Sequence, residues 1–85
     1  MEITREQLIR MGFTIVHDDI FFPKLKKERK DPESKVELTK VDEESWYVYC
    51  YRCDEKGKII KKLILEGIDS LEDLKQGTDL CGVII

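Results

Sequence analysis

The chain has 85 residues, of which 41% are apolar and 39% are charged. This length fits one domain with a single core, and it leaves few residues to line a deep catalytic cleft or a large cofactor site. The formal net charge of -3 excludes binding to nucleic acid or anionic lipid through the charge of the whole domain. Such binding would need a local basic patch.

The N-terminal segment and the cysteines indicate the compartment. Residues 1–10 carry charged side chains throughout, so they do not form the apolar stretch of a signal peptide. No window approaches the roughly 18 apolar residues that a membrane span needs. The 3 cysteines are an odd number, which favours reduced thiols over a disulfide framework. We therefore expect a cytoplasmic protein with no membrane contact and no cofactor.

A capping box predicts the first helix. Thr4 is followed three positions later by Gln7, and in this pattern each side chain satisfies a backbone N–H of the first turn. The helix is expected over Arg5–Met11 and should end at Gly12, which can take the left-handed conformation of a helix C-terminus. Its apolar positions are Leu8 and Met11 with Ile9 beside them, and Ile3 and Leu8 stand where a hydrophobic staple would pack.

Two short apolar runs and a basic segment follow. Phe13–Val16 and Ile20–Phe22 are β-branched and aromatic, which predicts two short strands around an acidic turn. Pro23 removes a ladder donor and would end the second strand or confine it to an edge. Residues 24–34 have Leu25 as their only large apolar residue, so their composition predicts a solvated basic loop that could be mobile. Its cations are Lys24, Lys26, Lys27, Arg29 and Lys30.

Three further strands are predicted with short connections between them. The first places Val36 and Leu38 on one face, and the acidic residues 42–45 after it indicate a turn. The connection between the second and third contains Gly57, which can take the positive φ of a hairpin turn. The three predicted strands are Lys35–Val41, Trp46–Cys53 and Lys58–Leu65.

A second helix is predicted near the C-terminus. Asp69 or Ser70 can cap it, and it is expected to end near Gly77. The side chains on its apolar side are Leu71 and Leu74. Residues 78–85 fit either a strand at the sheet edge or a further helical turn. Together the elements predict one α+β domain over residues 1–85, an antiparallel β-meander of about four to five short strands with an N-terminal helix and a short C-terminal helix.

The cysteines and the single histidine match the ligand count of a structural zinc site, in the set Cys50, Cys53, Cys81 and His17. The spacing of Cys50 and Cys53 argues against this site, because residues three apart on a regular strand point to opposite faces. The two thiols could reach one ion only if a bulge intervened. A redox dithiol would need a helix that starts at Cys50, and none is predicted there. We therefore favour free, packed cysteines, and the lone His17 carries no catalytic signature.

Three tyrosines alternate along one face of the second predicted strand; they are Tyr47, Tyr49 and Tyr51. Trp46 and Val48 lie on the other face and are expected to be buried against the helices, which leaves the tyrosine row partly open. Rigid amphipathic rings in a row are suited to bind a protein partner or to stack on nucleic-acid bases. The alternative is that the row pairs with Ile60 and Ile64, or lies under a helix as a second core layer.

These features lead to three functional hypotheses. We expect a non-enzymatic protein-interaction module that meets a protein partner, or a second copy of itself, through a sheet face or edge, because exposed edges and the apolar run Val83–Ile85 invite pairing. The first alternative is a single-stranded nucleic-acid-binding domain in which the basic residues 24–30 border the tyrosines. The second is a zinc-stabilised domain with three cysteines and a histidine as ligands.

Overall fold

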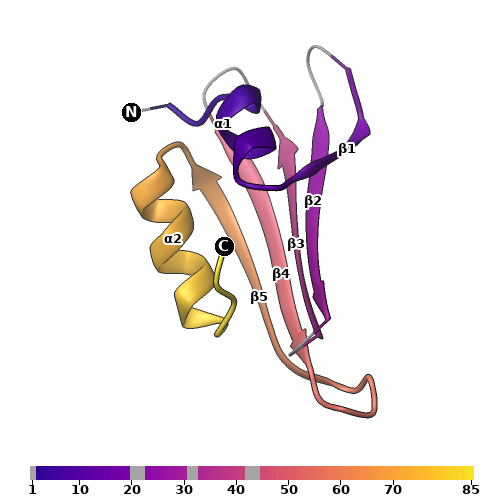
Figure 1. Cartoon of the computed structure of the whole chain (residues 1–85). Helices are drawn as coiled ribbons and strands as arrows, with labels where there is room; N and C mark the ends of the chain where they lie inside the picture. The colour runs from indigo at the N-terminus through magenta and orange to yellow at the C-terminus, as the bar shows by residue number, and fades with distance from the viewer. Residues whose placement is uncertain (1, 20–22, 31–32, 42–44) are drawn as a thin grey trace.

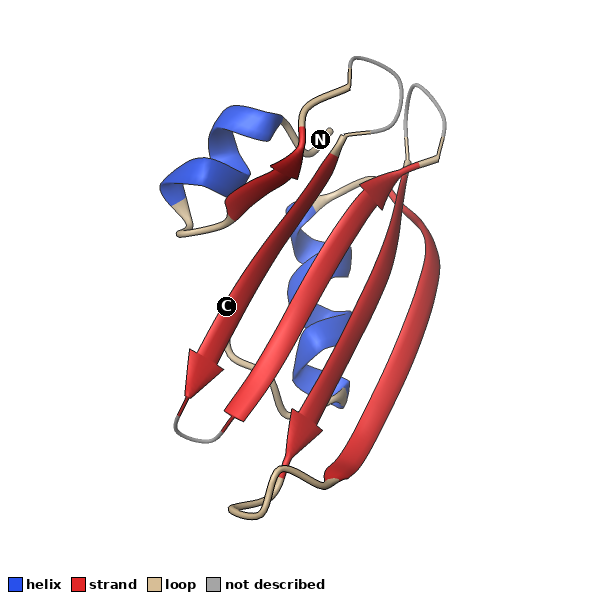
Figure 2. Cartoon of the chain, turned by 90° about the vertical axis from the view of Figure 1, so that its right-hand side faces the viewer, coloured by secondary structure: helices blue, strands red, loops and turns tan. Residues whose placement is uncertain are grey.

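The computed structural model describes residues 2–19, 23–30, 33–41 and 45–85. The elements are α1 (Arg5–Arg10), β1 (Thr14–His17), β2 (Lys24–Lys30), β3 (Glu33–Lys40), β4 (Trp46–Cys53), β5 (Ile59–Ile68) and α2 (Leu71–Leu80). The strands form one 5-stranded antiparallel sheet in the order β1-β2-β3-β4-β5. In Figure 1 α2 lies to the left of the strands and α1 lies at their upper end, and Figure 2, which looks from the right, has the strands in front and α2 behind them. The predicted α+β meander is confirmed.

Alternation along the central strands builds the core. In β3 and β4 buried positions alternate with partly exposed ones, which is the pattern of a strand with one buried face. The register places Val36 opposite Cys50, so buried side chains of neighbouring strands meet on the same side of the sheet. Trp46, with an exposed fraction of 2%, extends this buried row. The other residues of the core cluster are Ile3, Leu8, Phe13, Leu25, Leu38, Val48, Ile68, Leu74, Cys81 and Val83.

The first helix begins as predicted. Gln7 N donates to Thr4 Oγ1 (3.2 Å) and Thr4 N donates to Gln7 Oε1 (2.9 Å), which completes the capping box. Gly12 follows the helix with a φ of 96°, as its predicted role requires. Leu8 is fully buried, but Ile9, expected on the apolar side, is 46% exposed. A helix of 6 residues buries only a narrow stripe, and Ile9 lies outside it.

The basic segment is largely a strand, and the predicted loop over residues 24–34 is wrong. β2 pairs with β1 on one side and with β3 along its whole length on the other. Leu25 is completely buried and anchors β2 in the core. Lysines on the opposite face stay at the surface, so their charges are not desolvated. A basic composition is therefore compatible with a strand. Residues 31–32, the predicted strand Ile20–Phe22 and residues 42–44 of the predicted turn lie outside the described residues.

The connection between β4 and β5 is the predicted hairpin turn. Asp54 Oδ1 accepts two backbone N–H bonds across it (2.9 and 3.0 Å), and Gly57 has a φ of 80°. β5 continues to Ile68, beyond its predicted end at Leu65. The pairing of β4 with β5 is regular from Lys61 to Leu65, and its register shifts beyond both ends of that stretch.

The second helix starts at the predicted cap and extends past its predicted end. Ser70 Oγ accepts a hydrogen bond from Asp73 N (3.1 Å). The prediction that the helix ends near Gly77 is wrong, because this glycine lies inside α2 where the helix packs on the sheet. A Cβ atom on Gly77 would overlap Leu65 Cδ1 of β5. The glycine therefore permits close packing of helix on strand instead of terminating the helix.

The last residues complete the core. After α2 the chain turns at Gly82, which has a φ of 77°. Val83 is 2% exposed and Ile85 packs against the core, whereas Ile84 is 70% exposed. Residues 83–85 are in neither a strand nor a helix. The apolar run that was expected to favour self-association is therefore mostly covered within the fold.

Candidate binding face of the sheet

The side of the sheet away from the helices carries one continuous set of side chains, which we call the open face. The register defines it, because residues opposite each other on antiparallel strands point to the same side. Tyr49 lies opposite Glu37 of β3 and opposite Ile64 of β5. The open face comprises Lys24, Lys26 and Glu28 of β2, Lys35, Glu37 and Thr39 of β3, Tyr47, Tyr49 and Tyr51 of β4, and Lys62 and Ile64 of β5.

The three tyrosines run along β4 on the open face, as their spacing predicts. Each is partly exposed, whereas Trp46 and Val48 on the other side of β4 are buried. The ring centroids of Tyr49 and Tyr51 are 5.7 Å apart with the planes tilted by 60°, and Lys62 Nζ lies 5.5 Å from the Tyr49 centroid. Burial raises the pKa of Tyr51, so its phenol is neutral at physiological pH. The row thus presents aromatic surface with a cation at its margin.

Contacts with the neighbouring strand account for part of the burial of the tyrosine row. Tyr49 lies opposite Ile64, as the packing alternative expects. Ile60 falls in the irregular part of β5 and is not opposite a tyrosine in the regular ladder. Ile64 remains 46% exposed, and Figure 2 has no helix over this side of the described chain. The pairing therefore fills the outer surface without creating a second core layer beneath a helix.

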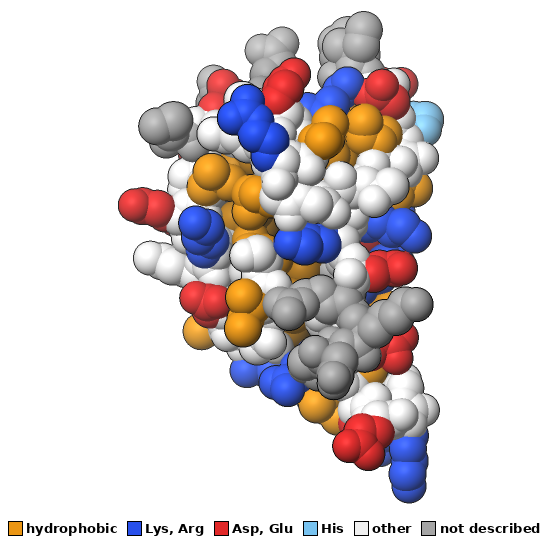
Figure 3. All heavy atoms as spheres, viewed as in Figure 1, with side chains coloured by type: hydrophobic (Ala, Val, Ile, Leu, Met, Phe, Trp, Pro, Cys, Tyr) orange, Lys and Arg blue, Asp and Glu red, His pale blue; other side chains and the backbone are white. Residues whose placement is uncertain are grey.

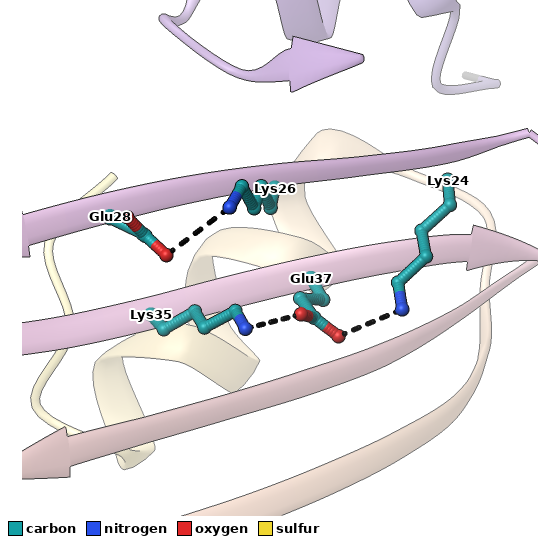
Figure 4. A network of polar contacts seen from close by, with 5 residues as sticks. All are labelled: Lys24, Lys26, Glu28, Lys35 and Glu37. Atoms are coloured by element: carbon teal, nitrogen blue, oxygen red, sulfur yellow. Dashed lines mark hydrogen bonds and ion pairs between the residues drawn. The ribbon is translucent and has the colours of Figure 1, made fainter. Parts of the chain in front are cut away.

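Ion pairs flank the tyrosines on β2 and β3 (Figure 4). Glu37 lies between two lysines: its Oε1 is 2.6 Å from Lys35 Nζ and its Oε2 is 3.4 Å from Lys24 Nζ. Lys26 Nζ lies 3.4 Å from Glu28 Oε1. The hydrogen bond between Lys35 and Glu37 lowers the pKa of Glu37 and raises the pKa of Lys35. The three lysines of β2 and β3 on the open face thus share two carboxylates, and each lies beside one of them.

The basic segment does not act as one patch. Lys24 and Lys26 are on the open face, but Lys27 points to the helix side and donates to a main-chain oxygen at the end of α1 (2.6 Å). The side chains of Arg29 and Lys30 lie outside the described part of the structure. On the side of the molecule seen in Figure 3, cations, carboxylates and apolar side chains are likewise interspersed.

Sequence reasoning missed five members of the open face: Glu28, Lys35, Glu37, Thr39 and Lys62. For Lys35 and Glu37 the signal was present, because the alternation that places Val36 in the core also places its neighbours outside. The contact of Lys62 with the tyrosine row depends on the β4–β5 register, which the hairpin length does not fix once bulges are present.

All three cysteines are buried. Cys50 faces the core, where Cys81 Sγ donates to the Cys50 carbonyl oxygen (3.6 Å). Burial raises the pKa of Cys50 to about 12, and contact with Cys81 adds to this effect. Cys53 is buried as well, with an exposed fraction of 6%, and it lies near Tyr51 and Glu33 just after the register shift at Arg52. His17 is exposed on the edge strand β1. Among the described residues no group of three or more His, Cys, Asp or Glu side chains is placed to hold a metal ion.

Comparisons with known proteins add no constraint on function. No protein-family model matches the chain, and no curated protein or solved structure gives a significant match. Neither helix of the described chain is long and apolar enough to span a bilayer. The function is therefore argued from the geometry of the open face.

Proposed function

We propose that the protein is a small non-enzymatic interaction module that binds a protein partner through the open face. One observation carries this proposal: a whole side of the 5-stranded sheet has no described helix over it and bears three partly exposed tyrosines in a row. Tyrosine rings supply large contact area, lose little side-chain entropy on binding and keep a hydroxyl for hydrogen bonding. Aromatic anchors of this kind dominate the energetics of protein interfaces.

The surroundings of the tyrosines fit the anatomy of a protein interface. Tyr49 and the half-exposed Ile64 form an apolar centre, and Glu37 with its lysines lies on the neighbouring strand as a polar margin. The apolar centre can be desolvated at low cost, whereas the paired charges can remain hydrated at the rim of the interface, where they pay no desolvation penalty. A protein surface with apolar groups at its centre and polar groups around them would complement this arrangement.

The charges support a protein partner over single-stranded nucleic acid. The basic strand and the tyrosines do share one face, which is the geometry that the nucleic-acid hypothesis requires. However, affinity for phosphates comes from cations that release counterions, and Lys24 and Lys35 already pair with Glu37. A phosphate strand along β2 and β3 would also have to pass the Glu37 carboxylate. Lys26 is likewise engaged by Glu28.

Site-specific photo-crosslinking in cells that express the protein tests this proposal. A photoreactive amino acid at Thr39, next to the tyrosines on the open face, should form a discrete adduct with a protein partner. The same probe at Lys75, exposed on α2, is the matched control and should not form that adduct. Adding Tyr49→Ala to the Thr39 probe should reduce the adduct roughly tenfold or more, because it removes a central aromatic anchor.

Two results would contradict the proposal. The first is the same adducts from Thr39 and Lys75, or none from Thr39, since binding would then not involve the open face. The second is an adduct that nuclease removes, together with binding of purified protein to mixed single-stranded oligonucleotides that weakens steeply as salt rises. That second result would favour the nucleic-acid hypothesis.

A further inference from the structure

The edge strand β5 offers an unpaired ladder. It has 10 residues and pairs with β4 on one side only, since β5 is the last strand of the sheet. In Figure 2 it forms the right-hand margin of the sheet, and α2 lies behind the strands and not beside β5. Ile59, Ile60 and Ile64 of this strand are each about half exposed. A long edge with exposed apolar side chains is a template for pairing with another strand.

The sequence of β5 is complementary to itself when read in the opposite direction. Residues 62–66 are Lys-Leu-Ile-Leu-Glu, with opposite charges at equal distances from Ile64. In an antiparallel pair of two such strands centred on Ile64, Lys62 lies opposite the partner's Glu66, and the reverse pair forms as well. Ile64 then lies opposite Ile64 of the partner subunit. Two opposite-charge pairs and one β-branched pair form on the same face, and each is a stabilising cross-strand contact.

The geometry of β5 suits this register. Its ladder with β4 is regular from Lys61 to Leu65, so Lys62 and Ile64 lie in regular strand, while Glu66 follows the last regular pair and adjoins Gly67, which has a φ of 70°. Among the described residues neither Lys62 nor Glu66 has an ion-pair partner. Lys62 Nζ lies over the Tyr49 ring, and the dimer would exchange this contact for the partner's Glu66. A two-fold axis perpendicular to the sheet would keep both helical layers on one side and join the two open faces on the other.

We infer that two copies of the chain form a symmetric dimer by antiparallel pairing of β5 with β5, centred on Ile64. The inference goes beyond the proposed function, because it concerns the pairing of the β5 edge with a second copy, and Lys62 and Ile64 of the open face lie at the seam. The dimer would present one continuous open face of two joined sheets.

Charge reversal gives a specific test. Lys62→Glu places two Glu–Glu pairs across the dimer axis, and Glu66→Lys places two Lys–Lys pairs there, so each variant should weaken self-association on the order of 10- to 100-fold. A mixture of the two variants should recover it, because every cross-strand pair is then Glu–Lys. Lys61→Glu, which makes the same charge change one residue away on the helix side, is the control and should dimerise like the unaltered chain.

Sedimentation velocity from low to high micromolar concentration measures these associations, and circular dichroism verifies that the surface variants remain folded. A monomeric unaltered chain over this range would overturn the inference. So would Lys62→Glu and Glu66→Lys variants that dimerise as the unaltered chain does, or a mixture that stays monomeric. Crosslinking from Thr39 in the Glu66→Lys variant separates the two proposals, because Glu66 is not among the open-face residues: loss of the dimer with retention of the partner adduct leaves the proposed function standing.

Discussion

Gly77 lies inside α2 at the point where the helix packs against β5. Replacing an interior helical glycine by alanine normally stabilises a helix by about 0.5–1 kcal/mol. Here the added methyl would overlap Leu65 Cδ1, and forcing an extra carbon into packed surroundings costs about 1–3 kcal/mol. The overlap outweighs the gain in propensity, so Gly77→Ala should lower the free energy of unfolding by about 0.5–2 kcal/mol.

The sign of the effect depends on Leu65, which gives a double-mutant cycle. In a Leu65→Ala background the obstructing side chain is absent, so Gly77→Ala should stabilise the protein by about 0.5–1 kcal/mol. Gln76→Ala, at the exposed neighbouring position, controls for helix propensity and should change stability by less than about 0.5 kcal/mol. Urea unfolding followed by circular dichroism measures all four variants against the unaltered chain.

The packing argument is refuted if Gly77→Ala stabilises the unaltered background by the full helix-propensity gain. It is also refuted if the change has the same sign and size with and without the Leu65 side chain, because the effect would then not come from that contact.

Three further predictions concern other parts of the fold. Leu25→Ala should cost about 2–5 kcal/mol in urea unfolding because Leu25 is fully buried in β2; a cost below about 0.5 kcal/mol would mean that the segment is a loop. The hydrogen bond from Lys35 lowers the pKa of Glu37 below its usual 4.5. The ionised Glu37 therefore stabilises the folded protein above that pH, and this stabilisation is lost as the pH falls through the lowered pKa. In the Glu37→Gln variant, urea midpoints measured between about pH 3 and 6 should no longer show this loss of stability at low pH. The same pH dependence in the variant and the unaltered chain would contradict the pairing. Cys50 should resist iodoacetamide at neutral pH until the protein unfolds, because burial raises its pKa to about 12; labelling in the folded state would show that it is accessible.

Local signals in the sequence predicted the elements whose ends are set by local chemistry. The Thr4 and Gln7 capping box, the Ser70 cap and the Gly57 turn each depend on a few neighbouring residues, and all three are present in the structure. The alternation in β4 likewise predicted which side of the strand is buried. The same alternation predicts that Cys50 and Cys53 lie on different sides of β4, and the β4–β5 register shifts between Arg52 and Cys53.

Elements that depend on distant contacts could not be predicted in the same way. β2 has the composition of a loop, and it is a strand because β1 and β3 supply its ladder and the core accepts Leu25. Gly77 has the local signature of a helix end, and the helix continues because close packing on Leu65 requires a residue without a side chain. In both cases a tertiary contact overrides a local preference.

The open face was predicted in part for the same reason. The tyrosine row follows from two-residue spacing alone, whereas its neighbours depend on which strands lie beside β4 and in what register. Lys62 comes near Tyr49 only through the β4–β5 pairing, and Glu37 joins two lysines from different strands. From composition, the cations of residues 24–30 were predicted to lie in one loop. In the structure they lie on a strand, β2, whose alternation divides them between two sides of the sheet.

Solvent exposure on the two sides of β4 is the most direct test of an open face. With a soluble paramagnetic agent added to dilute protein, the NMR signals of the Tyr47, Tyr49 and Tyr51 rings should broaden strongly, while those of Trp46 and Val48 should stay sharp. Tyrosine rings as protected as Trp46, or equal broadening of both sets, would contradict it.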